Sequence, residues 1–272
     1  MNPGGLRLSG LLLSGLLSLA VSAAAALQPG AISEFVVELP TELRALAGGR
    51  RLSKVQHALV AVALPKDFDP ARTWPILVIS ATSDPTFNSS RRLLRSYAET
   101  ATAAGWVALA ADPQEKISPD EDGLPLRFAL VATALGGLEI QWPAGAKAPL
   151  AFGGFSGGAK HSGWLAAEFA TQGQVPLGVF QAGINEDTLT PAARQFKVAN
   201  AAFRRLPVFL LGGRTDEIAP PAAHHAVERS LKRAGFRNVR LEFFDGPHVV
   251  DPRPLRLALE WFAAEAAKPA GK

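Results

Sequence analysis

Pro149-Leu-Ala-Phe-Gly-Gly-Phe-Ser156-Gly-Gly-Ala-Lys160 joins an apolar run to a segment that favours a helix. Within it, residues 154–158 match the pattern Gly-x-Ser-x-Gly. This pattern is typical of a sharp turn between a strand and a helix, where the serine has strained backbone angles and small neighbours avoid a clash. The helix that follows directs the positive end of its dipole at the turn. The pattern therefore predicts that Ser156 is a nucleophile at the end of a strand.

Apolar and amphipathic segments alternate on both sides of this turn. Strands are predicted where the apolar residues are continuous or β-branched, at residues 34–39, 57–64, 74–80, 106–111, 149–153, 176–181, 207–211 and 239–244. Helices are predicted between them, at residues 88–104, 124–138, 157–171, 191–205, 220–234 and 254–267. This alternation indicates a mostly parallel sheet with helices on both faces. No repeat or low-complexity linker divides the chain, so one domain is expected over residues 27–272.

A serine nucleophile needs a base, and the base needs an acid that orients it. Of the five histidines, His248 alone stands in a loop between the last predicted strand and the last predicted helix. Asp216 directly follows the strand predicted at 207–211. The order Ser156, Asp216, His248 fits a nucleophile on this kind of turn. Alternatives for the acid follow the preceding strand or flank the histidine: Asp187, Asp245 and Asp251.

These residues resemble the α/β-hydrolase superfamily, especially its small secreted esterases similar to polyhydroxyalkanoate depolymerases, feruloyl esterases and dienelactone-hydrolase-like proteins. The resemblance covers nearly all of the chain after the N-terminal segment. It includes residues 64–70 and Trp74-Pro-Ile-Leu-Val, which resemble the family's entry into the first central strand. It implies an α/β-hydrolase fold and a Ser156–His248–Asp216 triad. It also implies cleavage of carboxylic esters through an acyl-enzyme, without a cofactor.

One departure from the family pattern concerns the oxyanion hole. Many relatives carry His-Gly after the first central strand, whereas this strand ends Ser80-Ala-Thr-Ser83. A backbone donor does not require a particular side chain, so we expect the Thr82 or Ser83 N–H to act together with the Gly157 N–H.

The N-terminal residues have the order of a secretory signal peptide. A short start with one Arg is followed by the apolar residues 8–21 and by the small side chains of 22–26. Residues 1–26 are therefore predicted to be a signal peptide and the protein to be secreted or periplasmic, without stable membrane association after cleavage. The alternative is an uncleaved membrane anchor, since residues 8–26 are about long enough to span a bilayer.

Composition narrows the function further. The chain has no cysteine, which excludes disulfides, a catalytic cysteine and a thiolate zinc site. No His-Glu-x-x-His motif or carboxylate cluster indicates a metal. The formal net charge is +4, but the basic residues are scattered without interleaved aromatics, which argues against nucleic-acid binding.

The expected partner is thus a small-molecule or polymeric ester. The alternatives are a peptidase or amidase on the same fold, and a non-catalytic binding protein. Residues 182–206 are too few for a large lid beside their predicted helix, so an open cleft is expected. Its wall residues are predicted to be Phe87, Phe155 and Trp142, unless these belong to the core.

Overall fold

The computed structural model describes residues 21–22, 26–198 and 201–268. The predicted signal peptide, residues 1–26, lies outside the described residues apart from Val21, Ser22 and Ala26. None of the helices in the described ranges is both long and apolar enough to cross a membrane.

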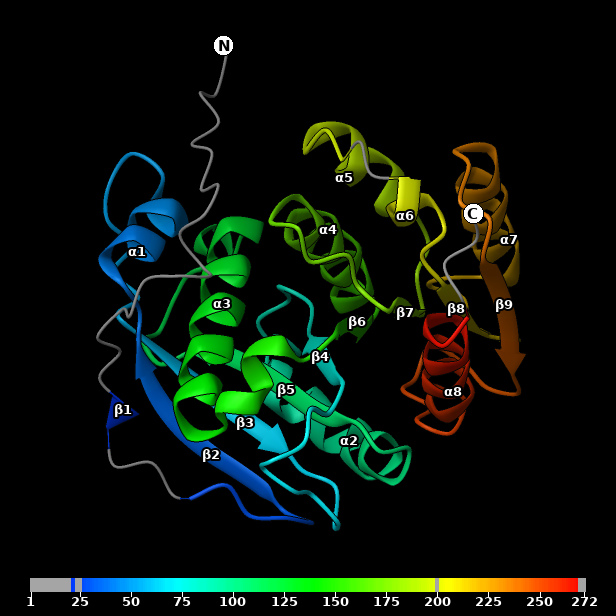
Figure 1. The fold of residues 1–272 in the computed structure, drawn as a ribbon. Coiled ribbons are helices and arrows are strands. Elements are labelled where there is room, and N and C mark those ends of the chain that lie inside the picture. The colour runs from blue at the N-terminus through cyan, green and yellow to red at the C-terminus, as the bar shows by residue number, and fades with distance from the viewer. Residues whose placement is uncertain (1–20, 23–25, 199–200, 269–272) are drawn as a thin grey trace.

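The described strands form one sheet in the order β1-β2-β3-β5-β4-β6-β7-β8-β9 (Figure 1). In chain order the strands are β1 (Val21–Ser22), β2 (Ile32–Glu38), β3 (His57–Ala63), β4 (Ile76–Ser80), β5 (Val107–Pro113), β6 (Leu150–Phe155), β7 (Gly178–Ala182), β8 (Val208–Gly213) and β9 (Val239–Phe244). The first three strands are antiparallel to their neighbours, and β5, β4 and β6 to β9 are mutually parallel. The predicted mostly parallel sheet is confirmed.

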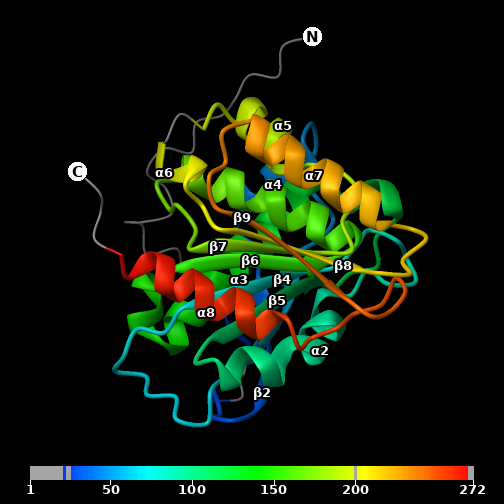
Figure 2. The same cartoon turned by 90° about the vertical axis from the view of Figure 1, so that its right-hand side faces the viewer.

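Helices cover both faces of this sheet, as predicted. They are α1 (Thr41–Gly48), α2 (Ser90–Ala103), α3 (Leu124–Gln141), α4 (Gly157–Thr171), α5 (Leu189–Gln195), α6 (Ala201–Arg204), α7 (Pro221–Arg233) and α8 (Leu255–Ala266). Figure 2 shows α2 and α8 on one side of the sheet and α4, α5 and α7 on the other, and the buried residues accordingly form two core clusters.

The sequence pattern of each element explains its place in these layers. Every residue of β4, β7 and β8 is buried, which matches their continuous apolar runs. Helix α8 buries residues 255, 258, 259 and 262, the spacing of a single helical stripe that faces the sheet. Helix α2 begins after Ser89, whose side chain accepts a hydrogen bond from the Arg92 N–H at 3.1 Å and so caps the helix.

The predicted helix at 191–205 is wrong. The structure has two short helices there, α5 and α6, and Lys197 between them has a φ of 53°. A residue with this left-handed backbone ends a right-handed helix. The structure also has an eight-residue helix, α1, where none is predicted from the sequence; it buries Leu43, and Leu46 and Ala47 pack partly buried against the core.

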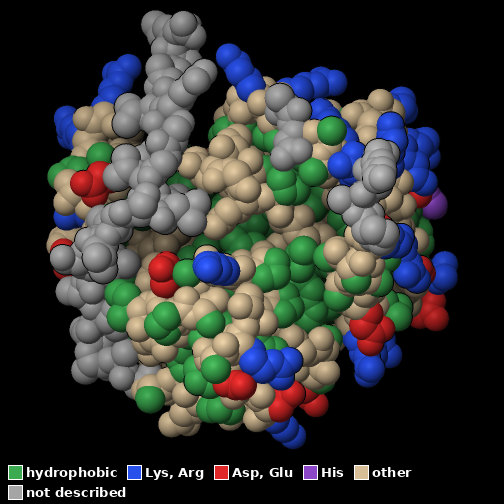
Figure 3. Space-filling view, viewed as in Figure 1, with side chains coloured by type: hydrophobic (Ala, Val, Ile, Leu, Met, Phe, Trp, Pro, Cys, Tyr) green, Lys and Arg blue, Asp and Glu red, His purple; other side chains and the backbone are tan. Residues whose placement is uncertain are grey.

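Charged side chains lie mostly around the margin of the face seen in Figure 3, with Asp and Glu among the Lys and Arg. On this face the basic residues form no continuous stripe.

Candidate active site

The turn between β6 and α4 holds Ser156 in a strained conformation. Ser156 has a φ of 55° and a ψ of −122°, a backbone conformation that residues other than glycine rarely adopt. A Cβ atom on Gly154 or on Gly158 would overlap the carbonyl oxygen of Ser80 on the neighbouring strand. The two glycines are therefore required by the close approach of β4, and the turn has the geometry that the sequence pattern predicts.

Asp216 lies in the loop after β8 and receives three hydrogen bonds. Its Oδ1 accepts the N–H groups of Ile218 and Ala219, at 2.9 and 2.7 Å, and its Oδ2 lies 2.7 Å from Nδ1 of His248. Burial alone would raise the pKa of Asp216, but the hydrogen bonds from Ala219, His248 and Ile218 together lower it below its ordinary value. The carboxylate is thus ionised at neutral pH and accepts the Nδ1 hydrogen of His248.

This hydrogen bond determines which nitrogen of His248 is available for chemistry. With the hydrogen of the neutral ring on Nδ1, the lone pair lies on Nε2, where it can accept a proton. The His248 side chain is 13% exposed, whereas that of Asp216 behind it is 1% exposed. An orienting carboxylate behind a neutral imidazole is the arrangement that a general base requires.

His248 and the Ser156 turn lie against the same segment of β7. The Ser156 N–H donates to the carbonyl oxygen of Ala182 at 2.8 Å. A Cβ atom on the next residue, Gly183, would be 2.8 Å from the Phe155 ring and 2.9 Å from Cε1 of His248. The rings of Phe155 and His248 are themselves 4.6 Å apart between centroids. The residues on either side of this contact thus place the Ser156 turn and His248 in one neighbourhood, although no hydrogen bond between the Ser156 hydroxyl and His248 is found among the described residues.

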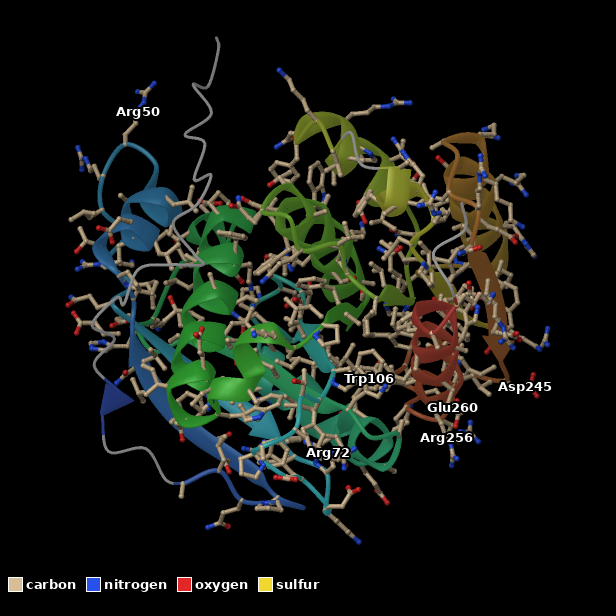
Figure 4. All side chains as sticks on the ribbon, in the orientation of Figure 1. Arg50, Arg72, Trp106, Asp245, Arg256 and Glu260 are labelled. Carbon is tan, nitrogen blue, oxygen red and sulfur yellow. The ribbon has the colours of Figure 1, made fainter. Side chains whose placement is uncertain are left out.

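The alternative acids are occupied elsewhere. Asp187 accepts hydrogen bonds from the Thr190 N–H and the Ser230 hydroxyl, at 3.0 and 2.7 Å, and so connects α5 to α7. Asp245 projects into solvent with its side chain 94% exposed (Figure 4). Asp251 pairs with Arg253 at 2.7 Å. Of the four candidates, Asp216 alone bonds to His248.

The two residues predicted to form the oxyanion hole are neighbours. A Cβ atom on Gly157 would lie 2.8 Å from Cβ and 3.1 Å from Cα of Thr82. No acceptor for the Thr82 or Gly157 N–H is found among the described residues. Unpaired N–H groups on two neighbouring residues, one at the N-terminus of α4 and one in the loop after β4, are the kind of donors that can bind a developing negative charge. Ser83, the alternative donor, directs its hydroxyl to the Asp122 carbonyl oxygen at 2.9 Å, away from this pair.

The three predicted wall residues differ in their surroundings. Phe87 is 68% exposed and Phe155 packs on His248, but Trp142 is fully buried and its indole N–H donates to the Arg72 carbonyl oxygen at 3.1 Å. Trp142 is therefore a core residue, because its ring packs at the far end of α3. Two exposed apolar residues missing from the prediction follow the acid and the base: Ile218 at 64% and Val249 at 47%.

Sequence reasoning also missed a group of buried polar residues beneath the loop after β4. It consists of the buried Asp112, Asp122 and Arg127 and of the half-buried His161. A sequence signal exists for one of them, since Arg127 is the single charged residue in the apolar first three turns of α3. No cluster of three or more metal-ligating side chains is found in the part of the chain that the structure describes.

Solved structures similar to this one are α/β hydrolases. A Xanthomonas campestris protein, described as an α/β serine hydrolase without a lid, has a TM-score of 0.54 and 18% identity, over 79% of this chain and 93% of its own. A cold-adapted esterase from an Arctic intertidal metagenomic library has a TM-score of 0.60 and 12% identity, over 90% of this chain and 98% of its own. Thermogutta terrifontis esterase 2, in a form phosphonylated by cyclosarin, has a TM-score of 0.53 and 16% identity, over 82% of this chain and 94% of its own.

No protein-family model matches the chain, and a search of curated proteins by sequence finds no match. The structural likeness is nevertheless clear: this chain has the α/β-hydrolase fold, as the sequence resemblance implies.

Proposed function

We propose that this protein is a serine hydrolase that cleaves carboxylic esters through an acyl-enzyme. The observation that carries the proposal is the buried Asp216–His248 hydrogen bond of 2.7 Å beside a serine at a φ of 55°. Serine hydroxyls are weak nucleophiles, and an oriented imidazole of this kind is what activates them. The solved esterases and the serine hydrolase with the same fold support this reading.

In the first half of the reaction, Ser156 Oγ attacks the ester carbonyl carbon while Nε2 of His248 accepts the hydroxyl proton. The negative charge that develops on the carbonyl oxygen is bound by the N–H groups of Gly157 and Thr82. Asp216 stabilises the imidazolium. The tetrahedral intermediate then collapses, and His248 gives its proton to the departing alcohol.

The second half repeats these steps with water as nucleophile. His248 removes a proton from water, which attacks the acyl carbon, and the acid is released from Ser156 as the serine regains its proton. The serine, the base, the acid and the oxyanion donors in these steps all belong to this chain. The proposed substrates are small soluble esters, or ester groups on a polymer, that reach an open cleft.

The test is hydrolysis of a panel of p-nitrophenyl and aliphatic esters by the wild type and by Ser156→Ala. We expect the substitution to lower kcat by several orders of magnitude, since the residues of a catalytic triad act as one unit and the loss of one removes most of the effect of the others. A fluorophosphonate probe should label the wild type on Ser156 and leave the variant unlabelled.

Ser162→Ala is the matched control, because Ser162 lies on the same helix and its hydroxyl donates to the Ala159 carbonyl oxygen at 2.7 Å. It should keep wild-type activity and labelling. Near-full activity of Ser156→Ala would overturn the proposed function.

A further inference from the structure

The loop after β4 carries the Thr82 N–H, and its backbone is fixed by side chains from three helices. The Ala81 N–H donates to Oγ of Ser90 on α2 at 3.1 Å. The Ala81 carbonyl oxygen accepts from Nδ1 of His161 on α4 at 2.8 Å. The Thr82 carbonyl oxygen accepts from Nη2 of Arg127 on α3 at 3.3 Å. These three contacts hold three successive peptide groups.

Because peptide bonds are planar, these contacts also fix the direction of the Thr82 N–H. In a trans peptide the carbonyl of one residue and the N–H of the next point in opposite directions. His161 holds the Ala81 carbonyl, so it also sets the direction of the Thr82 N–H, which belongs to the same rigid plane. Arg127 fixes the following plane through the Thr82 carbonyl. Thr82, which carries the N–H between these two planes, lies beside Gly157 through its side chain and Cα.

Arg127 is itself held from several sides. It is 3% exposed, and its guanidinium donates to Oδ2 of Asp122 at 2.6 Å and to Oγ of Ser90 at 2.9 Å. Oδ1 of Asp112, at the end of β5, lies 3.7 Å away. Buried ion pairs add little net stability because both charges lose their hydration. Because these ion pairs lie under the loop, they have another role: they fix the position of the Arg127 guanidinium, which holds the Thr82 carbonyl.

His161 connects the loop to the helix that begins at the nucleophile. Burial lowers its pKa, so the ring is neutral at pH 7, and its single hydrogen lies on Nδ1 because that atom faces a carbonyl oxygen. Since Ser156 and His161 both belong to the β6–α4 unit, this bond sets the distance between the serine turn and the loop.

We propose that His161 and Arg127 are positioning residues of the oxyanion hole: they lock the two peptide planes that flank Thr82 so that its N–H faces the same point as the Gly157 N–H. The proposal rests on the proposed ester hydrolysis and deepens it. Neither side chain touches the substrate. Both act through the backbone of residues 81–83, and their loss misdirects the donor without removing it.

The decisive comparison uses His161→Leu, which removes the donor, and His161→Asn, whose amide nitrogen stands near the position of Nδ1. For an ester and its thionoester analogue, we measure kcat and KM. Thiocarbonyl sulfur is a poor hydrogen-bond acceptor, so a misaligned oxyanion hole slows the ester more than the thionoester. His161→Leu should lower kcat for the ester by about tenfold or more. KM should stay close to the wild-type value, and the ester-to-thionoester ratio of kcat should fall.

His161→Asn should restore most of the ester rate. Arg127→Lys keeps the buried charge but cannot reach all of its partners, and it should lower kcat and the ratio in the same direction. The matched control is Arg44→Lys, since Arg44 also holds a loop carbonyl, that of Ser53 at 3.1 Å, far from the site. It should leave both constants unchanged.

The proposal is overturned if folded His161→Leu keeps its ester kcat within about twofold of the wild type, or if ester and thionoester rates fall by the same factor. Should circular dichroism show that His161→Leu is unfolded, Arg127→Lys is judged by the same two criteria. The wild type decides the proposed function separately. If it hydrolyses no ester, both ideas fail, whereas an active wild type with unaffected variants overturns this one alone.

Discussion

Asp216 differs from every other acid proposed for the site in what its two oxygens bind. One oxygen is held by backbone N–H groups of the same loop, and the other is left to face His248. The backbone bonds fix the carboxylate before any substrate arrives. An acid held in this way orients the base and remains charged while the base is protonated.

Asp216→Asn should therefore lower kcat by roughly three to four orders of magnitude, because an amide stabilises the imidazolium poorly and favours the wrong tautomer. Asp187→Asn is the matched control. Asp187 holds Thr190 and Ser230, so its substitution should lower the melting temperature and leave kcat near the wild-type value. Steady-state kinetics and thermal unfolding of both variants check this. A severe kinetic loss in Asp187→Asn with a mild one in Asp216→Asn would move the acid to the earlier strand.

Sequence and structure differ in what they reveal about single residues. Ser156, Asp216 and His248 could be proposed from the sequence because each follows a strand within a local pattern. Their catalytic roles stay predictions. Arg127 and His161 could not be proposed, since their backbone partners Thr82 and Ala81 are 45 and 80 residues away in the chain. Only the fold brings these pairs together.

At the scale of elements, the clearest sequence signals gave correct boundaries. Helix α4 covers Gly157–Thr171, the predicted range, because its start is fixed by the glycine pattern. The segment from 189 to 204 lacks such a signal. Its propensities favour a continuous helix, yet the chain turns at Lys197 so that Leu189 and Phe203 can both be buried. Tertiary packing overrides local preference there.

Helix α4 also carries an acid in an unfavourable place. Burial raises the pKa of Glu168 to about 7, above its ordinary value of 4.5. Between these values the folded state holds a proton that the unfolded state has lost, so the free energy of unfolding falls as pH rises through this window. Above pH 7 the full cost of ionising a buried carboxylate is present.

Glu168→Gln should thus be more stable than the wild type at pH 8, by roughly 1–3 kcal/mol, and by less than about 1 kcal/mol at pH 5. Denaturant unfolding at the two pH values measures the difference. Glu260→Gln is the control, because Glu260 lies on the surface of α8 beside Arg256 (Figure 4), with Oε1 2.7 Å from Nε of Arg256. Its effect should be small at both pH values. An equal shift for Glu168→Gln at pH 5 and pH 8 would contradict the burial argument.

At the scale of the whole molecule, the packing of the helices between two neighbouring strands supports the proposed open cleft. The connection from β7 to β8 carries α5 and α6, whose residues Leu189, Ala192 and Phe203 are buried in the core. In the described part of this connection, the helices pack on the body of the protein and form no separate cap. The loops that hold the site expose Phe87, Ile218 and Val249 instead.

Activity on p-nitrophenyl esters should therefore peak at short acyl chains of about two to four carbons, since a shallow apolar rim encloses little of a longer chain. The rate should rise smoothly through the critical micelle concentration of the substrate. Initial rates across a series of acyl lengths, with and without micelles, measure both properties. A preference for about twelve carbons or more, or a jump in rate at micelle formation, would indicate a deep tunnel or a lid that opens at interfaces.

The site residues also come from the ends of four strands of one sheet, β4, β6, β8 and β9, with β7 between β6 and β8. Parallel pairs of this kind close long loops before they gain any hydrogen bond, so they form late and slowly. A refolding chain can regain its helices and much of its collapsed core while the serine, the acid and the base are still apart. After dilution from denaturant, ester hydrolysis should return measurably later than helical circular dichroism. The rate at which ester hydrolysis returns would then report the rate of the last step of folding.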